Sequence, residues 1–244
     1  MAQAATKAAA PAPASALADS GQDTFTALGR VLALAQRGED RQLQQTSQVL
    51  ALRGEGLSGD VHADPLSPRQ LLLAGAPAYA SHGLAPGALR ENILLDFDTA
   101  ALRSGTVLQV GDEALLWLTF QCEACGQLDR HAPGLARRIG RRRGMLARVL
   151  RGGTIKPGDL VAVLPARVPP WSDDWRVRAA AVLAAVPDGM VIEYRQLARL
   201  VGVQSSYCRA LPALARAAGL AGKAVSLQDR SATPRWLGQE LFEP

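Results

Sequence analysis

Residues 105–120 read GTVLQVGDEALLWLTF, which is two apolar runs separated by a Gly-Asp turn. Apolar runs of roughly four to eight residues bounded by Gly, Asp or Pro are typical of β-strands. Similar runs lie on either side of this stretch: RVLALA (30–35), SQVLALRG (47–54), NILLDF (92–97) and DLVAVLP (159–165). Between them, SPRQLLLAGAPAYASHG (67–83) and residues 134–150 have helical character. We therefore predict a β-barrel or β-sandwich with helical inserts over residues 24–165.

The length and composition are those of a globular protein. The chain has 244 residues, which allows one large domain or two modest ones at roughly 100–200 residues each. Residues 1–23 are rich in Ala and Pro and predict a flexible tail rather than a secretory signal. No run approaches the roughly 20 apolar residues that cross a bilayer. Three cysteines are too few for a disulfide framework and favour a reducing compartment, so we expect a cytoplasmic protein without membrane contact.

Positive charge is concentrated in one segment. The chain carries a formal charge of +5, whereas residues 130–151 contain eight arginines and no acid, so the remainder is net acidic. Guanidinium groups bind phosphate and carboxylate in a bidentate manner, which makes this segment a candidate anion site. A solvated surface helix in an Arg-rich protein is the alternative interpretation.

The composition changes at ARVPPWSDDW, residues 166–175. Its two prolines predict a linker at 166–170 and a second domain over 171–244. We expect a helix with apolar positions at Val177, Ala181, Leu183, Ala184 and Ala185, ended by Pro187, then a short strand at 190–194 and further helices within 195–202 and 205–220. This order of helix, turn and helix is shared with small DNA-binding modules.

The first domain resembles the MOSC domain, named for the C-terminal part of molybdenum cofactor sulfurases. The resemblance covers roughly residues 29–165 and rests on the order of five pieces: GLSGDVHADPLSPRQLLL (56–73), PGALRENILLDF (86–97), TVLQVGD (106–112), CEAC (122–125) and GMLARVLRGGTIKPGDLVAVLP (144–165). It implies a β-barrel-like fold that binds a molybdenum-pterin cofactor or carries sulfur on a cysteine. The sequence departs from the family at Ala63, where glycine is usual, and at Cys122 and Ala124, which replace arginine and proline.

Several polar residues in these pieces are candidates for cofactor binding. Asp60 and His62 follow Gly59 on a turn where the backbone can approach a ligand. Guanidinium, carboxylate and amide groups suited to the edge of a pterin come from Arg69, Arg90, Glu91 and Asn92. The basic segment offers Arg141, Arg142, Arg143 and Arg148 to a pterin phosphate. The alternative for each is a structural role, such as an Asx turn or a bond to a loop carbonyl.

Cys125 takes the place of the family cysteine that the resemblance implies as sulfur carrier or molybdenum ligand, and so as the catalytic residue. Nearby cations favour the thiolate that both roles require. Three other roles stay open. Cys122 and Cys125 form a C-x-x-C that can cycle between dithiol and disulfide, the two thiols can hold half of a zinc site with His131, or they can be inert.

Residues 186–220 resemble the winged-helix domain of alkylguanine-DNA alkyltransferases and alkyltransferase-like proteins. Tyr194 and Arg209 match the positions that the family uses to flip a base. We expect the helix that carries Arg209 to start close to Tyr207 or Arg209, because Pro212 is tolerated only near a helix N-terminus. Ser205 and Ser206 would cap this helix and donate to phosphate. No Pro-Cys-His-Arg motif follows, so alkyl transfer is excluded. A degenerate module that docks a protein is the alternative to DNA binding.

Two functional hypotheses result. In the first, a molybdopterin-type cofactor or a sulfur on Cys125 serves sulfur transfer or reductive detoxification, with a sulfur donor or redox partner protein. No pyridoxal-phosphate domain accompanies it, since the chain has neither the length nor the lysine context for one. In the second, the winged helix binds DNA in a damage response without alkyl transfer. The sequence leaves open whether the protein turns over a substrate.

Overall fold

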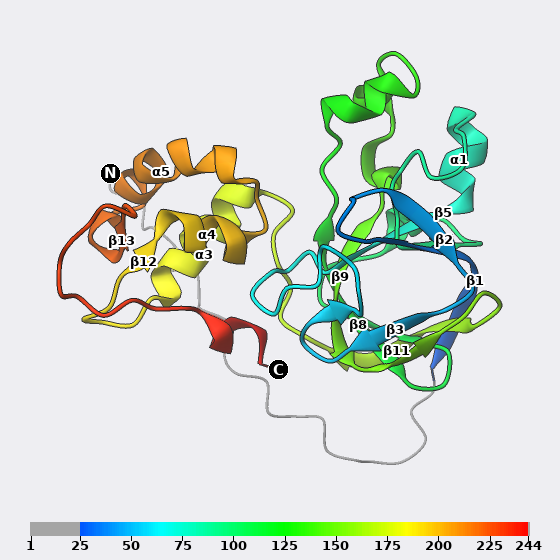
Figure 1. The fold of residues 1–244 in the computed structure, drawn as a ribbon, viewed down its shortest axis with the longest axis horizontal. Coiled ribbons are helices and arrows are strands. Elements are labelled where there is room, and N and C mark those ends of the chain that lie inside the picture. The colour runs from blue at the N-terminus through cyan, green and yellow to red at the C-terminus, as the bar shows by residue number, and fades with distance from the viewer. Residues whose placement is uncertain (1–24, 244) are drawn as a thin grey trace, which may run out of the picture. The chain divides into compact units, whose positions relative to one another are not determined.

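The two runs of residues 105–120 form adjacent antiparallel strands, in which Leu108 lies opposite Leu116. They belong to a computed structural model that describes residues 25–243, so the tail expected at 1–23 lies outside the described residues. The chain divides into two compact units, one ending at Trp171 and the other starting at Ser172. Figure 1 shows a strand-rich unit and a smaller helical one.

Seven strands close into a barrel, because the first and last strands of the ring pair with each other. Their spatial order is β11 (Leu160–Arg167), β7 (Thr106–Val110), β8 (Ala114–Gln121), β9 (Met145–Arg151), β5 (Leu71–Gly75), β6 (Ile93–Leu95) and β1 (Thr26–Arg37). β2 (Leu43–Thr46) extends the sheet from β1. A second sheet consists of β10 (Gly153–Ile155), β3 (Val49–Leu52) and β4 (Gly56–Leu57). The predicted β-barrel with helical inserts is thus confirmed.

The alternation of side chains along the strands separates the barrel interior from its outer face. In β5, Leu71 and Leu73 are part of the main core, whereas Leu72 between them points outward. The outward side chains of Leu72, Phe120, Cys122 and Leu146 form a second buried cluster, against which Trp171 packs. We call this group the outer cluster. It connects three neighbouring strands, β5, β8 and β9, on one side of the barrel.

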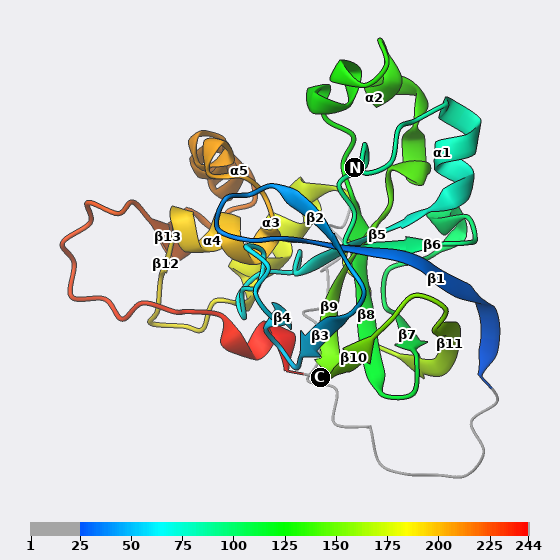
Figure 2. The same ribbon diagram turned by 45° about the vertical axis from the view of Figure 1, so that its right-hand side comes forward.

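Helical segments cover one end of the barrel, where Figures 1 and 2 place α1 (Ala76–His82) and α2 (Leu135–Arg138) next to each other. Two 3-10 helices flank α2, namely η2 (Gly126–Arg130) and η3 (Gly140–Arg143). Buried residues from α1, η2 and α2 share one core cluster. The helices predicted over 67–83 and 134–150 are therefore wrong in extent. Residues 71–75 and 145–151 are strands, because their apolar residues fill the barrel.

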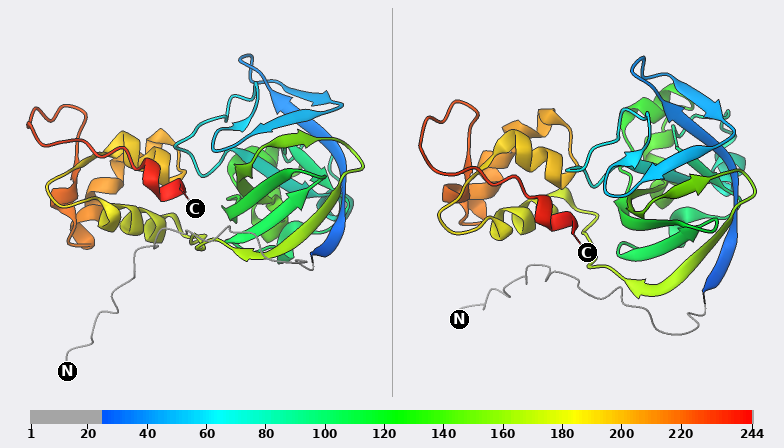
Figure 3. Two further views of the ribbon diagram at one scale, coloured as in Figure 1. Left: turned by 90° about the horizontal axis from the view of Figure 1, so that it is seen from below. Right: turned by 60° about the horizontal axis from the view of Figure 1, so that its bottom comes forward.

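The second unit contains three α-helices and a pair of short parallel strands among its described residues. They are α3 (Trp175–Ala185), α4 (Tyr194–Val201), α5 (Leu211–Ala217), β12 (Ile192–Glu193) and β13 (Ala224–Val225). Between α4 and α5 lies the 3-10 helix η4 (Ser205–Arg209). The segment after β13 returns along the helices, as Figure 3 shows, and the Gln196 side chain of α4 donates to the Leu237 carbonyl.

Arg178 joins α3 to α4. Its buried guanidinium donates to the Val201 carbonyl at 3.0 Å, at the C-terminal end of α4, where orphan carbonyls favour a cation. The buried face of α3 contains Ala179, Val182 and Leu183. Val177, expected on the apolar face, is 54% exposed.

Among the described residues, no helix is long and apolar enough to span a membrane.

Candidate functional site

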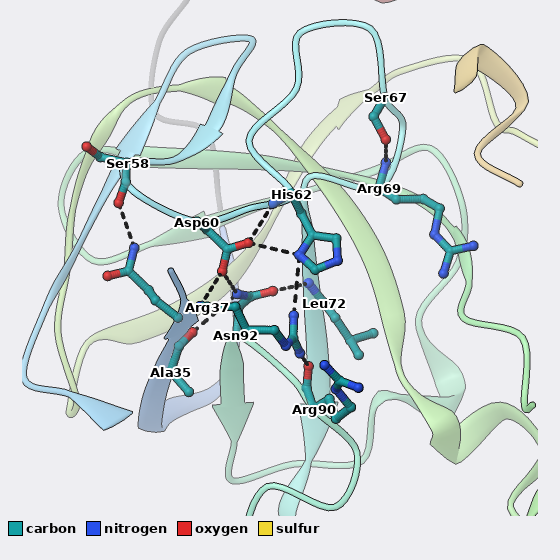
Figure 4. A network of polar contacts seen from close by, with 11 residues as sticks. Ala35, Arg37, Ser58, Asp60, His62, Ser67, Arg69, Leu72, Arg90 and Asn92 are labelled. Carbon is teal, nitrogen blue, oxygen red and sulfur yellow. Dashed lines mark hydrogen bonds and ion pairs between the residues drawn. The ribbon is translucent and has the colours of Figure 1, made fainter. Parts of the chain in front are cut away.

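A turn after β4 carries a buried carboxylate, Asp60, beside an exposed imidazole, His62 (Figure 4). Gly59 starts this turn with a positive φ of 82°, a conformation that glycine adopts without strain. One oxygen of Asp60 accepts from the backbone N–H of His62 at 2.8 Å and lies 2.9 Å from His62 Nδ1. The other accepts from the Arg37 backbone at 3.0 Å and from Asn92 Nδ2 at 2.8 Å.

These contacts decide the charge of Asp60 and the tautomer of His62. Burial raises the pKa of the Asp60 carboxyl, but the hydrogen bonds from the His62 side chain and from the backbone of Arg37 and His62 outweigh it, so its pKa lies below the usual value. An ionised carboxylate only accepts, so Nδ1 of His62 must donate to it. The 3.4 Å approach of Arg37 Nη1 to the same nitrogen is therefore a contact rather than a hydrogen bond. This leaves Nε2 of a neutral His62 as a proton acceptor.

Asn92 fixes the carboxylate to the barrel. Its amide nitrogen also donates to the Ala35 carbonyl, and its amide oxygen accepts from the Leu72 backbone at 3.0 Å. Asn92 is 2% exposed, and its side chain joins β1 and β5 at the point where β6 begins. Its polar atoms are thus used within the protein, which matches the structural role left open for it.

Two further arginines, Arg90 and Arg143, lie near Arg37, which contacts His62. Arg37 ends β1, is 5% exposed and donates from Nη2 to the Arg90 carbonyl. Burial and the repulsion from Arg90 and Arg143 lower the pKa of Arg37, while Asp60 and Glu91 oppose this. Arg143 is 8% exposed and donates to the Leu89 carbonyl at 2.8 Å. Among the described residues, the buried Nε atoms of Arg37 and Arg143 have no hydrogen-bond partner. We call Arg37, Arg90 and Arg143 the arginine group.

Arg90 and Glu91 both affect the arginine group, the first through its backbone and the second through its charge. Arg90 has a positive φ of 55°, which a residue with a Cβ rarely adopts. Glu91 is buried and accepts from the Tyr79 hydroxyl at 2.7 Å and 2.6 Å. Burial and the Glu91 charge raise the pKa of Tyr79, so its hydroxyl stays protonated and keeps donating. Glu91 thus partly neutralises the arginine group without occupying the two free Nε atoms.

The basic segment does not converge on one anion. Arg141 bonds the carbonyls of Ala100 and Leu102, and Arg142 forms an ion pair with Asp98 at 2.8 Å. Arg148 is 3% exposed, and burial lowers its pKa to about 9. Its guanidinium donates to the carbonyls of Ser67, Gly54 and Pro65 and so holds the loop before β5. Of the four candidates in this segment, only Arg143 lies close enough to Arg37 to lower its pKa. The side chain of Arg69 extends away from Asp60 and His62 (Figure 4).

The two thiols of the C-x-x-C have different surroundings. Cys122 is buried in the outer cluster, and its backbone N–H donates to the Gly144 carbonyl at 2.9 Å. Cys125 is exposed and precedes η2. Both are free thiols. In the described part of the chain, no three His, Cys, Asp or Glu side chains gather as a metal site, so the zinc alternative with His131 finds no such cluster.

Packing links Cys125 to the arginine group. Leu128, whose N–H donates to the Cys125 carbonyl, packs in the same cluster as Leu89. Leu89 precedes Arg90 and accepts from Arg143. Leu72 provides a second link, since its backbone is bonded to Asn92 while its side chain packs with Cys122. The backbone at Cys125 and the Leu89 carbonyl that Arg143 bonds are therefore connected through one core cluster.

In the second unit, Tyr194 begins α4 and is half-buried, while Ser205, Ser206 and Arg209 are exposed on η4. The helix that was expected to carry Arg209 starts later than predicted. It is α5, which begins at Leu211, because Pro212 lacks an N–H and is accommodated only in the first turn. Ser205 and Ser206 consequently do not cap it, and Arg209 lies before it.

Sequence reasoning missed Arg37 and Tyr79. Arg37 interrupts the apolar alternation at the end of β1, a signal that a charged side chain occupies a special position. Nothing in the local pattern indicates Tyr79, whose partner lies twelve residues away. Both are found only when the barrel brings β1, α1 and the segment before β6 together.

Comparison with known proteins supports the MOSC resemblance of the first domain. Residues 69–162 match the MOSC domain. The YuaD protein from Bacillus subtilis has a similar structure, with a TM-score of 0.51, 17% identity, and coverage of 58% of this chain and 98% of that one. YiiM from Escherichia coli gives a TM-score of 0.46 at 19% identity, covering 85% of this chain and 99% of its own. No curated protein sequence matches significantly. The alkyltransferase resemblance of the second unit is not confirmed.

Proposed function

Since residues 69–162 of the barrel unit match the MOSC domain, we propose that this unit binds a molybdopterin-type cofactor or carries sulfur on Cys125, for sulfur transfer or reductive chemistry. The observation that carries the proposal is an exposed thiol linked by packing to two buried guanidiniums with unused Nε donors. Buried donors without a partner are costly, and an anionic ligand would satisfy them.

The donor set fits such a cofactor. A soft thiolate is a suitable molybdenum ligand, and guanidiniums are suitable for a phosphate. Arg37 and Arg143 would hold the anionic end, with Arg90 closing the site from the exposed side. When bound, the cofactor would supply a metal centre that exchanges atoms and electrons with a substrate.

The chain itself would contribute charge and a proton acceptor. With three cations against Asp60 and Glu91, the local charge is +1 before a ligand binds, so an anion is attracted. Asp60 keeps Nδ1 of His62 protonated and the ring oriented, so that Nε2 can accept a proton from a bound molecule or return it. Cys125 would add an exposed thiolate, connected to this group through the core cluster of Leu89 and Leu128.

Sulfur carriage needs only Cys125 and a donor. The Cys125 thiolate would attack the outer sulfur of a persulfide on a donor protein, the donor thiolate would leave, and Cys125 would hold the sulfur as a persulfide. No net oxidation occurs in this exchange.

Metal and pterin analysis tests the cofactor. Protein purified from a host that makes molybdenum cofactor should contain molybdenum and an oxidisable pterin. Cys125→Ser should lose the molybdenum, whereas Cys208→Ser, in the other unit, should retain it. Wild-type protein that carries neither molybdenum nor pterin, and forms no Cys125 persulfide with a desulfurase and free cysteine, would refute the proposal.

A matched pair of arginine variants tests the anion site. Arg143→Gln should weaken pterin or phosphate binding by about 1.5–3 kcal/mol, because it removes a charged donor. Arg142→Gln removes the same charge one residue away, but from an exposed pair with Asp98, and should leave binding nearly unchanged. Equal losses in the two variants would show that only diffuse charge matters.

A further inference from the structure

Glu91 has an unusual partner for a buried carboxylate. It is 7% exposed, and its two oxygens lie 2.7 Å and 2.6 Å from the Tyr79 hydroxyl. A buried carboxylate normally pairs with a cation, because a charged donor offsets more of its desolvation than a neutral hydroxyl does. The arginine group offers such cations, yet in the described part of the chain none of them forms an ion pair with Glu91. The carboxylate is bonded to a neutral phenol instead.

The charge of Glu91 nevertheless acts on the arginine group. Burial and Arg90 lower the pKa of Arg37, and Glu91 is one of the two carboxylates that oppose this. The buried Nε atoms of Arg37 and Arg143 have no hydrogen-bond partner among the described residues. Unused buried donors are costly, and a carboxylate that turned toward them would satisfy them. The present position of Glu91 therefore needs a restraint.

Tyr79 provides this restraint. Its ring packs against the core cluster that includes Leu89, and its carbonyl accepts from the Leu84 N–H at 3.1 Å, at the end of α1. The hydroxyl that bonds Glu91 also accepts from the Leu89 N–H at 3.3 Å. The carbonyl of Leu89 accepts from Arg143 at 2.8 Å. The phenol and Arg143 are thus fixed on the same residue, one through its N–H and the other through its carbonyl.

We propose that Tyr79 is a positioning residue, which holds the Glu91 carboxylate away from Arg37 and Arg143 so that their Nε donors stay open to an anionic ligand. This role rests on the anion site proposed above. Glu91 then acts on the ligand through its charge and without contact. Because the Coulomb energy is proportional to the ligand charge, Glu91 weakens the binding free energy of a dianion about twice as much as that of a monoanion. The pair therefore limits the preference of the site for highly charged anions.

Sulfate and nitrate are suitable probes, because one is a dianion and the other a monoanion throughout the neutral pH range. Titration of the full chain with each salt, at constant ionic strength, is followed by the NMR signals of the Arg37 and Arg143 Nε–H groups. Glu91→Gln should bind sulfate about tenfold and nitrate about threefold more tightly. Tyr79→Phe should bind sulfate about tenfold more weakly, because the released carboxylate pairs with a guanidinium and competes with the anion.

The double variant Tyr79→Phe, Glu91→Gln separates positioning from a merely structural role. It contains no carboxylate that can compete, so its sulfate affinity should match that of Glu91→Gln alone. A structural role would give the same loss in both backgrounds. The matched controls are Glu113→Gln, at an exposed turn of the barrel unit, and Tyr207→Phe, in the second unit. Both should leave the two affinities almost unchanged.

Unchanged sulfate binding in Tyr79→Phe would overturn the positioning role, as would equal losses in the two backgrounds. Sulfate affinity that does not rise in Glu91→Gln, or that rises no more than nitrate affinity, would overturn it as well. So would a wild type in which neither Nε–H signal responds to sulfate. None of these titrations depends on molybdenum, pterin or Cys125. A protein without cofactor or persulfide can therefore refute the proposed function and keep this result, and a cofactor-loaded protein with equal losses refutes the positioning role alone.

Discussion

Asp60 uses both carboxylate oxygens on contacts with Arg37, His62 and Asn92, and a pKa below the usual value results. Each of these donors comes from a different place in the chain, so the carboxylate joins the turn after β4 to β1 and to the start of β6. At the scale of single residues, the site is therefore built around an anion of the protein itself, which orients His62 and leaves the arginine group for a ligand.

Asp60→Asn should lower the free energy of unfolding at neutral pH by about 2–3 kcal/mol, because a charged acceptor of several hydrogen bonds is replaced. A carboxyl with a depressed folded pKa stabilises above its unfolded pKa, about 4, and loses that contribution as pH falls through the folded value. The wild type should therefore lose more stability than the variant below about pH 4 in denaturant titrations. Asp112→Asn, at an exposed turn, is the control, and parallel pH profiles for wild type and Asp60→Asn would contradict the assignment.

The three thiols should react with an alkylating agent in the order Cys125, Cys208, Cys122. Cys125 is exposed, Cys208 is half-buried with its sulfur near the Tyr194 carbonyl, and Cys122 is buried in the outer cluster. Reactivity requires access as well as a thiolate. Peptide mass spectrometry of briefly labelled folded protein measures the order, which should vanish in denaturant. Labelling of Cys122 as fast as Cys125 in the folded state would contradict it.

At the scale of elements, the start of β9 decides where Arg143 and Cys122 lie. Gly144 separates η3 from β9 with a φ of 116°, and its carbonyl accepts from the Cys122 N–H. A Cβ there would lie 2.4 Å from the Leu73 carbonyl oxygen in β5. The close approach of two strands, and not only the turn, therefore requires glycine at this position.

Gly144→Ala should destabilise the barrel by about 3 kcal/mol or more and should make Cys122 reactive, because the clash moves the backbone that holds it. Gly158→Ala is the matched control, since Gly158 also has a positive φ, 92°, but nothing lies within 4 Å of a Cβ there. It should cost only about 1 kcal/mol. Thermal unfolding and thiol labelling of the two variants measure the difference, and equal costs would show that strain alone matters.

At the scale of the whole molecule, the barrel unit includes the segment expected as a linker. β11 runs to Arg167, and the Val168 N–H donates to the Gly105 carbonyl at 3.0 Å. The backbone N–H of Trp171 donates to the Ser104 hydroxyl at 2.6 Å. The Trp171 ring packs edge-on against that of Trp117, with 6.1 Å between the ring centroids. The prolines at 169–170 thus lie within the compact unit, which ends at Trp171.

A chain ending at Trp171 should unfold cooperatively and keep the labelling difference between Cys122 and Cys125. The same chain with Trp171→Ala should be about 2–3 kcal/mol less stable, because the outer cluster loses a partly buried ring. Denaturant unfolding followed by circular dichroism measures both. A shortened chain without a cooperative transition would show that the barrel needs the second unit.

The sequence by itself predicted the strand-rich first domain and the helices near 175–185 and 194–201, because these follow from local patterns. Runs bounded by Gly-Asp turns specify strands, and caps and prolines specify helix ends. The strand at 145–151 escaped prediction, since a basic apolar segment suits a helix equally well.

Only the tertiary structure decided which charged residues act together. Eight arginines in one segment suggested one anion site, yet Arg141, Arg142 and Arg148 are used on carbonyls and Asp98. Arg143 instead lies near Arg37 and Arg90, which come from distant parts of the chain. The physical reason is that a buried guanidinium must satisfy its donors wherever the fold provides acceptors, and those acceptors are set by strand pairing between residues far apart in the chain.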